Sequence, residues 1–504
     1  MSFQADSLER DALEVLRLVR SIKNSFAPIN RIPPEVLSLI PGYYDEDDTD
    51  QASITLTHVC HSWRDTFTSC SSLWTRLDLT NVDKTHAYIQ RSRSAPFKLC
   101  LVGGRVIDDA FAMMIPHTHR FKSLTIDAKA LPSILRYRMP LLEKLDIYIY
   151  PANGTVLDDT LFGGDLSSLY HLRLHGITTD FPWKNLPNLR TVDLRSLQHR
   201  YGTTQLLDFF ESAPLLHTVR LVYWKPDLSD PPPERIVPLR HLKEFFIQTD
   251  SSHSILLQHI HLPFGASLVS ESRFSGETPV PVLDYLPAGS PNLSNLSHIT
   301  MANFLFDSRS KYVRLSGPSG RLRLLFSRDD WVIPSSCSWE CEILRSLGPP
   351  TFSTVRRLTV STCERLGTPE DEECPIFLTL SSARDLQTLV LVRCDNLPFI
   401  LALDPEQTQS NLVLCPNLQN LIFYVQSLSP RVVERLARMA KNRASRGTKL
   451  SSVTIVELSG RGRSNELFEL REHVTHVGYY TYGEPPAWDD VPDESCGGGR
   501  IVSR

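Results

Sequence analysis

The chain has 504 residues, enough for several domains or for one extended array of repeats. Hydrophobic residues make up 41% of it and aromatic residues 9%, which is typical of a chain with a folded core and excludes a wholly disordered one. Its 53 basic and 57 acidic residues give a net charge of −4, so the composition favours neither nucleic acid nor a membrane surface as a partner.

Residues 1–27 are expected to form an N-terminal amphipathic helix, with the helical pattern clearest over 6–24. Leu8, Val15, Leu18, Val19 and Ile22 share much of one side, and charged residues cover the rest. The apolar side predicts either packing against the segment that follows or a short coiled coil. Charges throughout this region argue against a secretion signal, and no later stretch approaches a membrane-spanning length. We therefore expect a soluble protein of the cytoplasm, the nucleus or both, with its cysteines as thiols.

Residues 28–76 predict a small helical unit that begins at a pair of prolines. Pro33 and Pro34 fix the backbone ahead of Glu35, and proline and an acidic residue both suit the first turn of a helix. Leu37 and Ile40 continue the apolar side of this helix, which is expected to stop at the Pro-Gly pair at 41–42.

A second helix is predicted from about residue 53. Leu56, Val59, Cys60 and Trp63 recur at steps of three and four residues, which places them on one apolar stripe. Between the two helices, residues 43–51 form an acidic insertion that is expected to be a solvated loop. So small a unit is not expected to bury two tryptophans and several aliphatic residues alone, so a partner or the neighbouring domain should complete its surface.

Three short motifs occur in a fixed order in this unit. They are Pro33-Pro34-Glu35-Val36-Leu37, Val59-Cys60-His61-Ser62-Trp63-Arg64 and Leu73-Trp74. Together they resemble the F-box, in which two prolines and a glutamate precede apolar residues, Val-Cys precedes Trp-Arg, and Leu-Trp follows. Two departures from that family are Ile32, which stands where it has leucine, and the acidic insertion, since the family joins these helices compactly.

This resemblance implies that the helices dock on a Skp-type adaptor, which links the protein to a cullin ubiquitin ligase. The residues that it assigns to adaptor binding are Ile32, Pro33, Pro34, Glu35, Val36, Leu37, Ile40, Leu56, Val59, Cys60, Trp63, Leu73 and Trp74. The alternative interpretation is an ordinary helical hairpin packed on the next domain.

Residues 77–120 are expected to form a transitional repeat that caps the array behind it. Short strands at 77–79 and 97–103 flank a helix, and a self-similar pattern begins at about residue 121. Its clearest copies are MPLLEKLDI at 139, LPNLRTVDL at 186, APLLHTVRL at 213 and CPNLQNLIF at 415. The apolar residue that anchors each copy is Leu124, Leu145, Leu172, Val192, Val219, Phe245, Leu358, Leu389, Leu421 and Val453 in turn.

The pattern over residues 121–480 resembles leucine-rich repeats. That resemblance implies an α/β repeat fold, a solenoid whose parallel strands line a concave face while the connecting segments return along the outside. The register is irregular between 250 and 350, where RLRLLF at 321 places Leu322 or Leu324 inside. Cys363, Cys394 and Cys415 sit where such repeats carry small buried residues.

Two further segments complete the chain. Residues 429–446 predict a basic helix with Val433 and Leu436 inward and with Arg435, Arg438, Lys441 and Arg443 outward. Residues 481–504 are rich in proline, acids and glycine and are expected to be a flexible tail.

The sequence offers no motif for catalysis, a cofactor or a metal. The pair Cys337 and Cys341 lacks a second pair at zinc-site spacing, and no phosphate loop or nucleophile elbow is present. An enzyme is therefore the third hypothesis, behind two others: a substrate receptor of a Skp-cullin-F-box ubiquitin ligase, and a leucine-rich-repeat interaction scaffold without ligase activity. The residues expected to hold a protein substrate are Asp146, Arg173, Asp193, Arg195, Arg220, Phe246 and Gln248.

Overall fold

The structure is a computed structural model. It describes residues 2–43, 49–102, 107–127, 137–148, 165–176, 186–196, 201–223, 226–227, 234–249, 254–274, 292–296, 298–306, 310–318, 320–328, 353–362, 375–407, 412–427, 429–457 and 467–481. The chain divides into two compact units, the first made of residues 1–200 with 208–216 and the second of 201–207 with 217–504. It is an α/β protein, and 17 of its described strands belong to one large, mostly parallel sheet.

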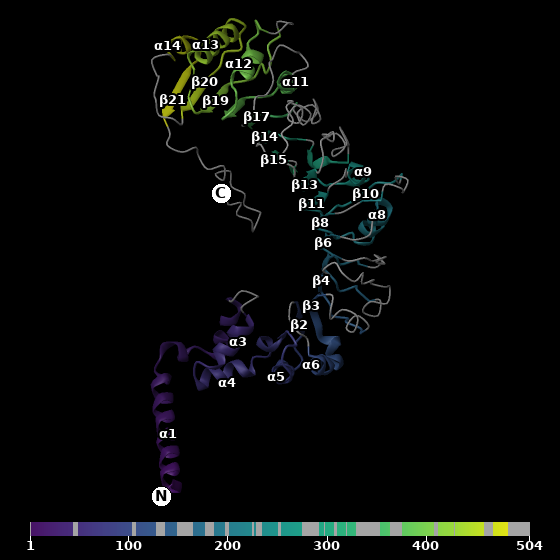
Figure 1. The fold of residues 1–504 in the computed structure, drawn as a ribbon, viewed down its shortest axis with the longest axis vertical. Helices are drawn as coiled ribbons and strands as arrows, with labels where there is room; N and C mark the ends of the chain where they lie inside the picture. Colours follow the sequence, from purple (N-terminus) through teal and green to yellow (C-terminus); the bar gives the residue numbers. More distant parts are fainter. Residues whose placement is uncertain are drawn as a thin grey trace. The chain divides into compact units, whose positions relative to one another are not determined.

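The first unit opens with one long helix followed by short ones (Figure 1). They are α1 (Ser2–Ser25), η1 (Pro28–Arg31), α2 (Pro34–Leu37), η2 (Ile40–Tyr43), α3 (Thr49–Thr57), α4 (His61–Ser69) and η3 (Ser71–Trp74). The predicted N-terminal helix is confirmed, but its described side chains from Asp6 to Phe26 are exposed. The prediction that this helix packs against the next segment was therefore wrong. A turn separates the two, and it is fixed by the Asn30 side-chain amide, which donates to the Asn24 carbonyl at 2.8 Å.

The predicted second helix is in fact two helices. Cys60 adopts an extended conformation (φ −158°), ends the first stripe and accepts at its carbonyl the first hydrogen bond of α4, from the Arg64 amide. The Arg64 side chain then donates to the Thr57 carbonyl at 3.0 Å, which satisfies the end of α3. The helix at Pro34 spans one turn only, and the last three residues of the acidic insertion begin α3 rather than lie in a loop, while 44–48 lie outside the described residues.

Both tryptophans are buried, and the neighbouring segment supplies part of their cover, which is one of the two expected alternatives. The Trp63 ring meets Phe67 edge-on at 5.5 Å, and its indole N–H donates to the Asn30 side chain at 2.7 Å. Trp74 meets Tyr88 edge-on at 5.0 Å, and Tyr88 comes from the following helix α5 (Val82–Ser92). The neighbouring segment therefore completes this core.

The rest of the first unit is a series of parallel strands. Its elements are β1 (Arg76–Leu77), α5, β2 (Phe97–Leu101), α6 (Asp108–Met114), η4 (Ile115–Arg120), β3 (Phe121–Asp127), β4 (Lys144–Tyr148), β5 (His171–His175) and β6 (Thr191–Arg195). Each strand pairs with the next in sequence. The predicted anchors Leu124, Leu145, Leu172 and Val192 lie opposite one another and are fully buried, which confirms the strand register.

The second unit repeats this arrangement with an interruption. Its strands are β7 (Tyr201–Gly202), β8 (Thr218–Val222), β9 (Pro226–Asp227), β10 (Val237–Pro238), β11 (Glu244–Thr249), β12 (Ile260–His261), β13 (Ser267–Phe274), β14 (Met301–Phe306), β15 (Ser310–Gly317), β16 (Gly320–Arg328), β17 (Arg357–Thr362), β18 (Thr388–Val392), β19 (Asn420–Val425), β20 (Ser452–Glu457) and β21 (His476–Thr481). Its helices are α9 (Ser254–Gln258), η7 (Ser294–Leu296), α11 (Pro375–Ser382), α12 (Leu397–Leu403), α13 (Pro430–Ser445) and α14 (Phe468–His473), while α8 (Thr203–Ser212) spans the division between units.

The predicted register holds on both sides of the interruption. Val219 lies opposite Phe245, and Leu358, Leu389, Leu421 and Val453 lie opposite one another in sequence order. Between them, β14, β15 and β16 pair antiparallel, so the expectation of parallel strands alone was wrong there. Leu322 is buried opposite Leu268, whereas the side chain of Leu324 lies outside the described residues.

The recurring Pro-Asn-Leu of the repeat links one copy to the preceding segment. Asn188 donates from its side-chain amide to the Ser167 carbonyl at 2.7 Å, Asn292 to the Gln258 carbonyl at 2.7 Å, and Asn417 to the Arg384 carbonyl at 3.1 Å. Such bonds satisfy carbonyls of connecting segments that no strand pairs. The motif is thus explained by hydrogen bonding as well as by its apolar residue.

The basic helix α13 is confirmed, with one correction. Val433 and Leu436 are buried as predicted, but Arg443 is fully buried rather than outward. Its guanidinium donates to the carbonyls of Leu414 and Cys415 at 2.8 and 2.9 Å. The predicted small buried cysteine is confirmed at Cys415, whose thiol lies 3.2 Å from the Leu380 carbonyl. Cys394 is only partly buried, with its thiol 3.7 Å from the Val360 carbonyl. Cys363 and the tail from 482 lie outside the described residues.

Candidate functional site

The first candidate surface is the helical unit at residues 28–76. Among its predicted contact residues, Pro33, Pro34, Glu35, Val36 and Val59 are exposed. Ile32, Ile40 and Cys60 are partly exposed. Leu37, Leu56, Trp63, Leu73 and Trp74 are buried, so these five form the core under the surface and offer little area to a partner.

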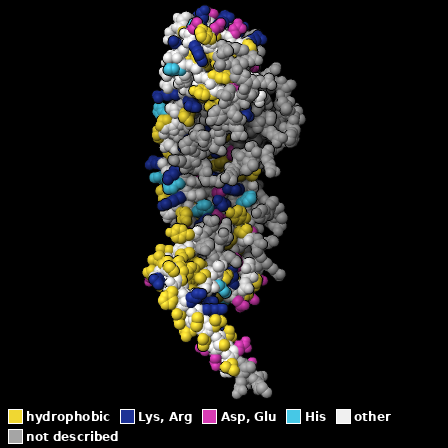
Figure 2. All heavy atoms as spheres, turned by 90° about the vertical axis from the view of Figure 1, so that its left-hand side faces the viewer, with side chains coloured by type: hydrophobic (Ala, Val, Ile, Leu, Met, Phe, Trp, Pro, Cys, Tyr) yellow, Lys and Arg dark blue, Asp and Glu magenta, His cyan; other side chains and the backbone are white. Residues whose placement is uncertain are grey.

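Further apolar side chains are exposed on this unit that the sequence reasoning missed. Leu39 is 63% exposed, and Ile29 and Ile54 are 42% and 41% exposed. Figure 2 shows hydrophobic side chains gathered over this part of the molecule. The sequence reasoning missed these three because they lie outside the motif residues and the helical stripe on which it relied.

We call Val36, Leu39, Ile54 and Val59, with Pro33 and Pro34, the apolar face of the unit. A folded core lies beneath it, so these side chains are exposed although the unit has its own interior. Single exposed apolar residues are ordinary, but several on one small helical unit make this face a candidate docking surface.

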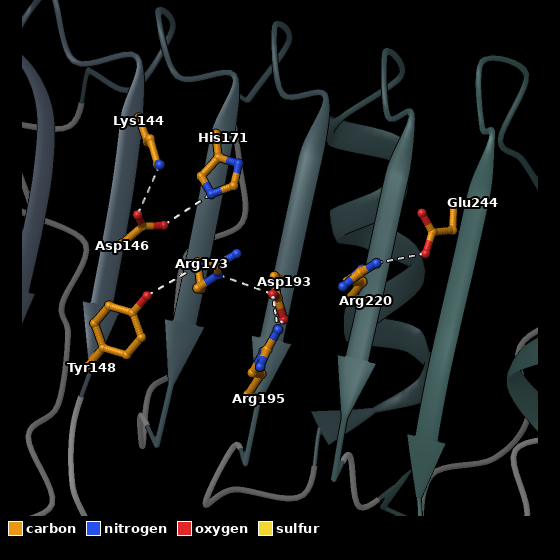
Figure 3. A network of polar contacts seen from close by, with 9 residues as sticks. All are labelled: Lys144, Asp146, Tyr148, His171, Arg173, Asp193, Arg195, Arg220 and Glu244. Atoms are coloured by element: carbon orange, nitrogen blue, oxygen red, sulfur yellow. Dashed lines mark hydrogen bonds and ion pairs between the residues drawn. The ribbon is translucent and has the colours of Figure 1, made fainter. Parts of the chain in front are cut away.

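The second candidate surface is a row of charged residues across β4, β5 and β6 (Figure 3). Asp146, Arg173 and Asp193 occupy the same register position on successive strands. They alternate in sequence with the buried anchors, because successive side chains of a strand point to opposite faces. Three residues that were predicted to contact a substrate are thus brought side by side.

Asp193 is the most buried of these charges. Its carboxylate accepts two hydrogen bonds from Arg195, both at 2.8 Å, and one from Arg173 at 3.1 Å. Arg173 also donates to the Tyr148 hydroxyl at 3.2 Å. The side chain of Asp193 is 2% exposed, so its charge is compensated inside the protein and both arginines are held in one orientation.

Asp146 forms the other end of the row. Its carboxylate lies 3.1 Å from His171 Nε2 and 3.6 Å from Lys144 Nζ. Burial would raise the pKa of Asp146, but the hydrogen bond from His171 and the nearby positive charges outweigh burial and lower the pKa. Asp146 therefore stays ionised and fixes His171.

The arginines keep part of their surface in solvent. The side chains of Arg173 and Arg195 are 34% and 39% exposed. Burial opposes the charge of Arg173, yet the Tyr148 hydroxyl and both aspartates raise its pKa, and the hydrogen bonds to Asp193 raise the pKa of Arg195. Burial and the charge of Arg195 lower the pKa of His175. This arrangement presents oriented donors suited to carboxylate or backbone carbonyl groups of a polypeptide.

The second unit carries its own polar contacts on β8 and β11. Arg220 lies 2.9 Å from the Glu244 carboxylate and 5.8 Å from the centre of the Phe246 ring, on the strand face opposite the anchors. Gln248 is buried, so its predicted contact with a substrate is limited to what its 7% exposure allows. Arg220 and Phe246 are partly exposed and suit a mixed protein surface.

In the described part of the chain, no cluster of three or more His, Cys, Asp or Glu residues is placed to hold a metal ion. The pair Cys337 and Cys341 lies outside the described residues. None of the helices in that part combines the length and apolarity needed to cross a bilayer.

No protein-family model matches the chain, and no curated protein is significantly similar to it.

Proposed function

We propose that the chain is the substrate-recognition subunit of a Skp-cullin-F-box ubiquitin ligase. In this proposal, residues 28–76 dock on the Skp-type adaptor and the strands behind them act as leucine-rich repeats that bind a protein substrate. The observation that carries it is the apolar face, where Val36 and Val59 are 51% and 55% exposed above a complete core.

The burial pattern separates two roles among the motif residues. Trp63, Phe67 and Trp74 fill the interior and hold the short helices together, while Val36, Leu39 and Val59 remain free to be covered. A docking partner that covers the exposed half of one of these valines gains about 1 kcal/mol from it, roughly half of the value for burying a fully exposed side chain. The exposed valines are therefore the positions where adaptor affinity should depend on single residues.

The proposed substrate surface is the polar face of β4–β6. Arg173 and Arg195 are oriented by Asp193 before any ligand binds, which reduces the conformational entropy lost on binding. Oriented guanidinium groups beside Tyr148 suit an acidic or carbonyl-rich stretch of a polypeptide. This supports a protein substrate rather than a small molecule.

The test uses the full chain and a purified Skp-type adaptor. Val36→Asp and Val59→Asp each place a charge on the apolar face without touching the core, unlike substitution of the buried Trp63. Each should weaken adaptor binding by at least about fivefold from the lost valine contact, and by more because docking would bury the new carboxylate. Leu412→Asp is the matched control, since Leu412 is 54% exposed in the second unit.

Co-elution and titration calorimetry measure the outcome. Binding by the natural chain and the control, with loss in both valine variants, supports the receptor. If the unmodified chain forms no complex with any Skp-type adaptor, the proposal of a substrate receptor is wrong. The remaining alternative is then an interaction scaffold without ligase activity. Binding by the valine variants that equals binding by the natural chain shows that docking uses another surface.

A further inference from the structure

We propose that α1 joins two copies of this chain as an antiparallel two-stranded coiled coil. This inference goes beyond the proposed function, because it concerns neither the adaptor nor the substrate. It starts from the fact that the described side chains of α1 are all exposed, including Val15 at 62% and Ile22 at 53%.

An isolated helix that exposes this apolar surface has little stability in water. A helix of 24 residues is about 36 Å long, and most helical stability in proteins comes from covering an apolar face. Nothing in the described part of the chain covers this face, although Figure 1 draws α1 as an uninterrupted helix.

The apolar residues of α1 have the spacing of a coiled-coil seam. Leu8, Ala12, Val15, Val19 and Ile22, with Phe26 one residue past the end of the helix, follow one another at steps of 4, 3, 4, 3 and 4 residues. The mean step of about 3.5 residues keeps one stripe facing a partner helix along its whole length. Leu16 and Leu18 flank this stripe, whereas Leu13, which is 47% exposed, lies away from both the stripe and its flanks.

The charges of α1 select the orientation of the pair. Residues 2–14 carry Asp6, Glu9, Asp11 and Glu14 against Arg10, a net charge of −3, and residues 15–25 carry Arg17, Arg20 and Lys23, a net charge of +3. Two parallel helices would place like halves together. Two antiparallel helices place each acidic half against a basic half, so a second copy of the same helix is the complementary partner.

One antiparallel alignment satisfies both the seam and the charges. It sets Val15 opposite Val19 of the second copy, Ala12 opposite Ile22 and Leu8 opposite Phe26. In the same alignment Glu9 flanks the seam against Lys23 of the second copy, and by symmetry this ion pair occurs twice. Leu16 and Leu18 meet their own copies on either side of the centre, which adds apolar contact.

The experiment measures the mass of the full chain over a concentration series by sedimentation equilibrium. The natural chain should dimerise weakly, in the micromolar range, because about three heptads form the contact. Val15→Asp with Val19→Asp should weaken the dimer at least 100-fold, because both central layers are lost. Leu13→Asp is the matched control, with the same substitution on the same helix, and should dimerise as the natural chain does.

A charge exchange tests the orientation and does not depend on folding of the seam variant. Glu9→Lys alone and Lys23→Glu alone should each weaken the dimer about five- to tenfold, because each creates two like-charge pairs. Mixing these two variants restores both ion pairs in an antiparallel heterodimer and should return the affinity to about that of the natural chain.

Three results would overturn the inference. They are a natural chain that stays monomeric at roughly 100 μM, a Leu13→Asp chain that loses dimers as fully as the seam variant, and a mixture of the charge variants that associates no better than each alone. None of these experiments measures adaptor binding, so a negative result here does not contradict the proposed function.

Discussion

Arg443 offers a direct test of how the C-terminal part of the second unit is held together. Arg443→Ala removes the donors to the Leu414 and Cys415 carbonyls and leaves both buried. An unsatisfied buried acceptor costs about 1–3 kcal/mol. Burial lowers the pKa of Arg443, and removing this cation returns part of the desolvation cost. We therefore expect a net loss of about 2–5 kcal/mol in the free energy of unfolding.

The assay is thermal and urea unfolding followed by circular dichroism. A loss of this size should lower the melting temperature by roughly 5–15 °C for a unit of this size. Arg438→Ala is the control on the same helix, because Arg438 is exposed and lies 3.5 Å from Glu406 in a surface pair that contributes about 0–1 kcal/mol. If the Arg443→Ala and Arg438→Ala chains unfold at the same temperature and the same urea concentration, the assigned hydrogen bonds do not stabilise the unit.

Two further predictions concern titratable groups. Asp146→Asn should destabilise the chain by about 1–3 kcal/mol at pH 7, since it weakens a charged hydrogen bond to His171. Because folding lowers the pKa of Asp146, its carboxylate stabilises the folded chain fully above the unfolded pKa, and this stabilisation is lost as pH falls through the folded pKa. The urea midpoints of the natural chain and of Asp146→Asn should therefore converge below about pH 4. A difference between the two midpoints that stays constant with pH would contradict this. Burial raises the pKa of Cys415 to about 12, so maleimide at pH 8 should leave it unmodified in the folded chain while labelling the partly exposed Cys70, as read by peptide mass spectrometry. Equal labelling of both thiols would contradict burial of Cys415.

The strand register was accessible from sequence because it depends on a short local pattern. Each anchor, such as Leu172 or Leu421, is an apolar residue at a fixed distance from a turn, and parallel pairing of equal strands brings equal positions together. The interruption at β14–β16 was not accessible in the same way. Antiparallel pairing there is chosen by tight connections, and the apolar pattern of RLRLLF is the same for either direction.

The structure of the helical unit at residues 28–76 could likewise be predicted only in part from the sequence. The motif residues around Trp63 could be found from their spacing, but spacing alone does not tell which apolar side chains are enclosed. Cys60 breaks the stripe by taking an extended conformation, and so Trp63 turns inward while Val59 stays exposed. The prediction that Arg443 points outward was wrong for a related reason. An arginine that points inward needs hydrogen-bond acceptors, and the carbonyl of Leu414, distant in sequence, supplies one.

The sequence by itself therefore determined the anchors of the parallel strands and the apolar stripe of α1, since each follows from local spacing and side-chain polarity. The tertiary structure alone decided which of those apolar residues are covered and how the charges of β4–β6 pair, with Asp193 between Arg173 and Arg195. Burial and ion pairing depend on segments distant in the chain, and no local pattern records which distant segment arrives.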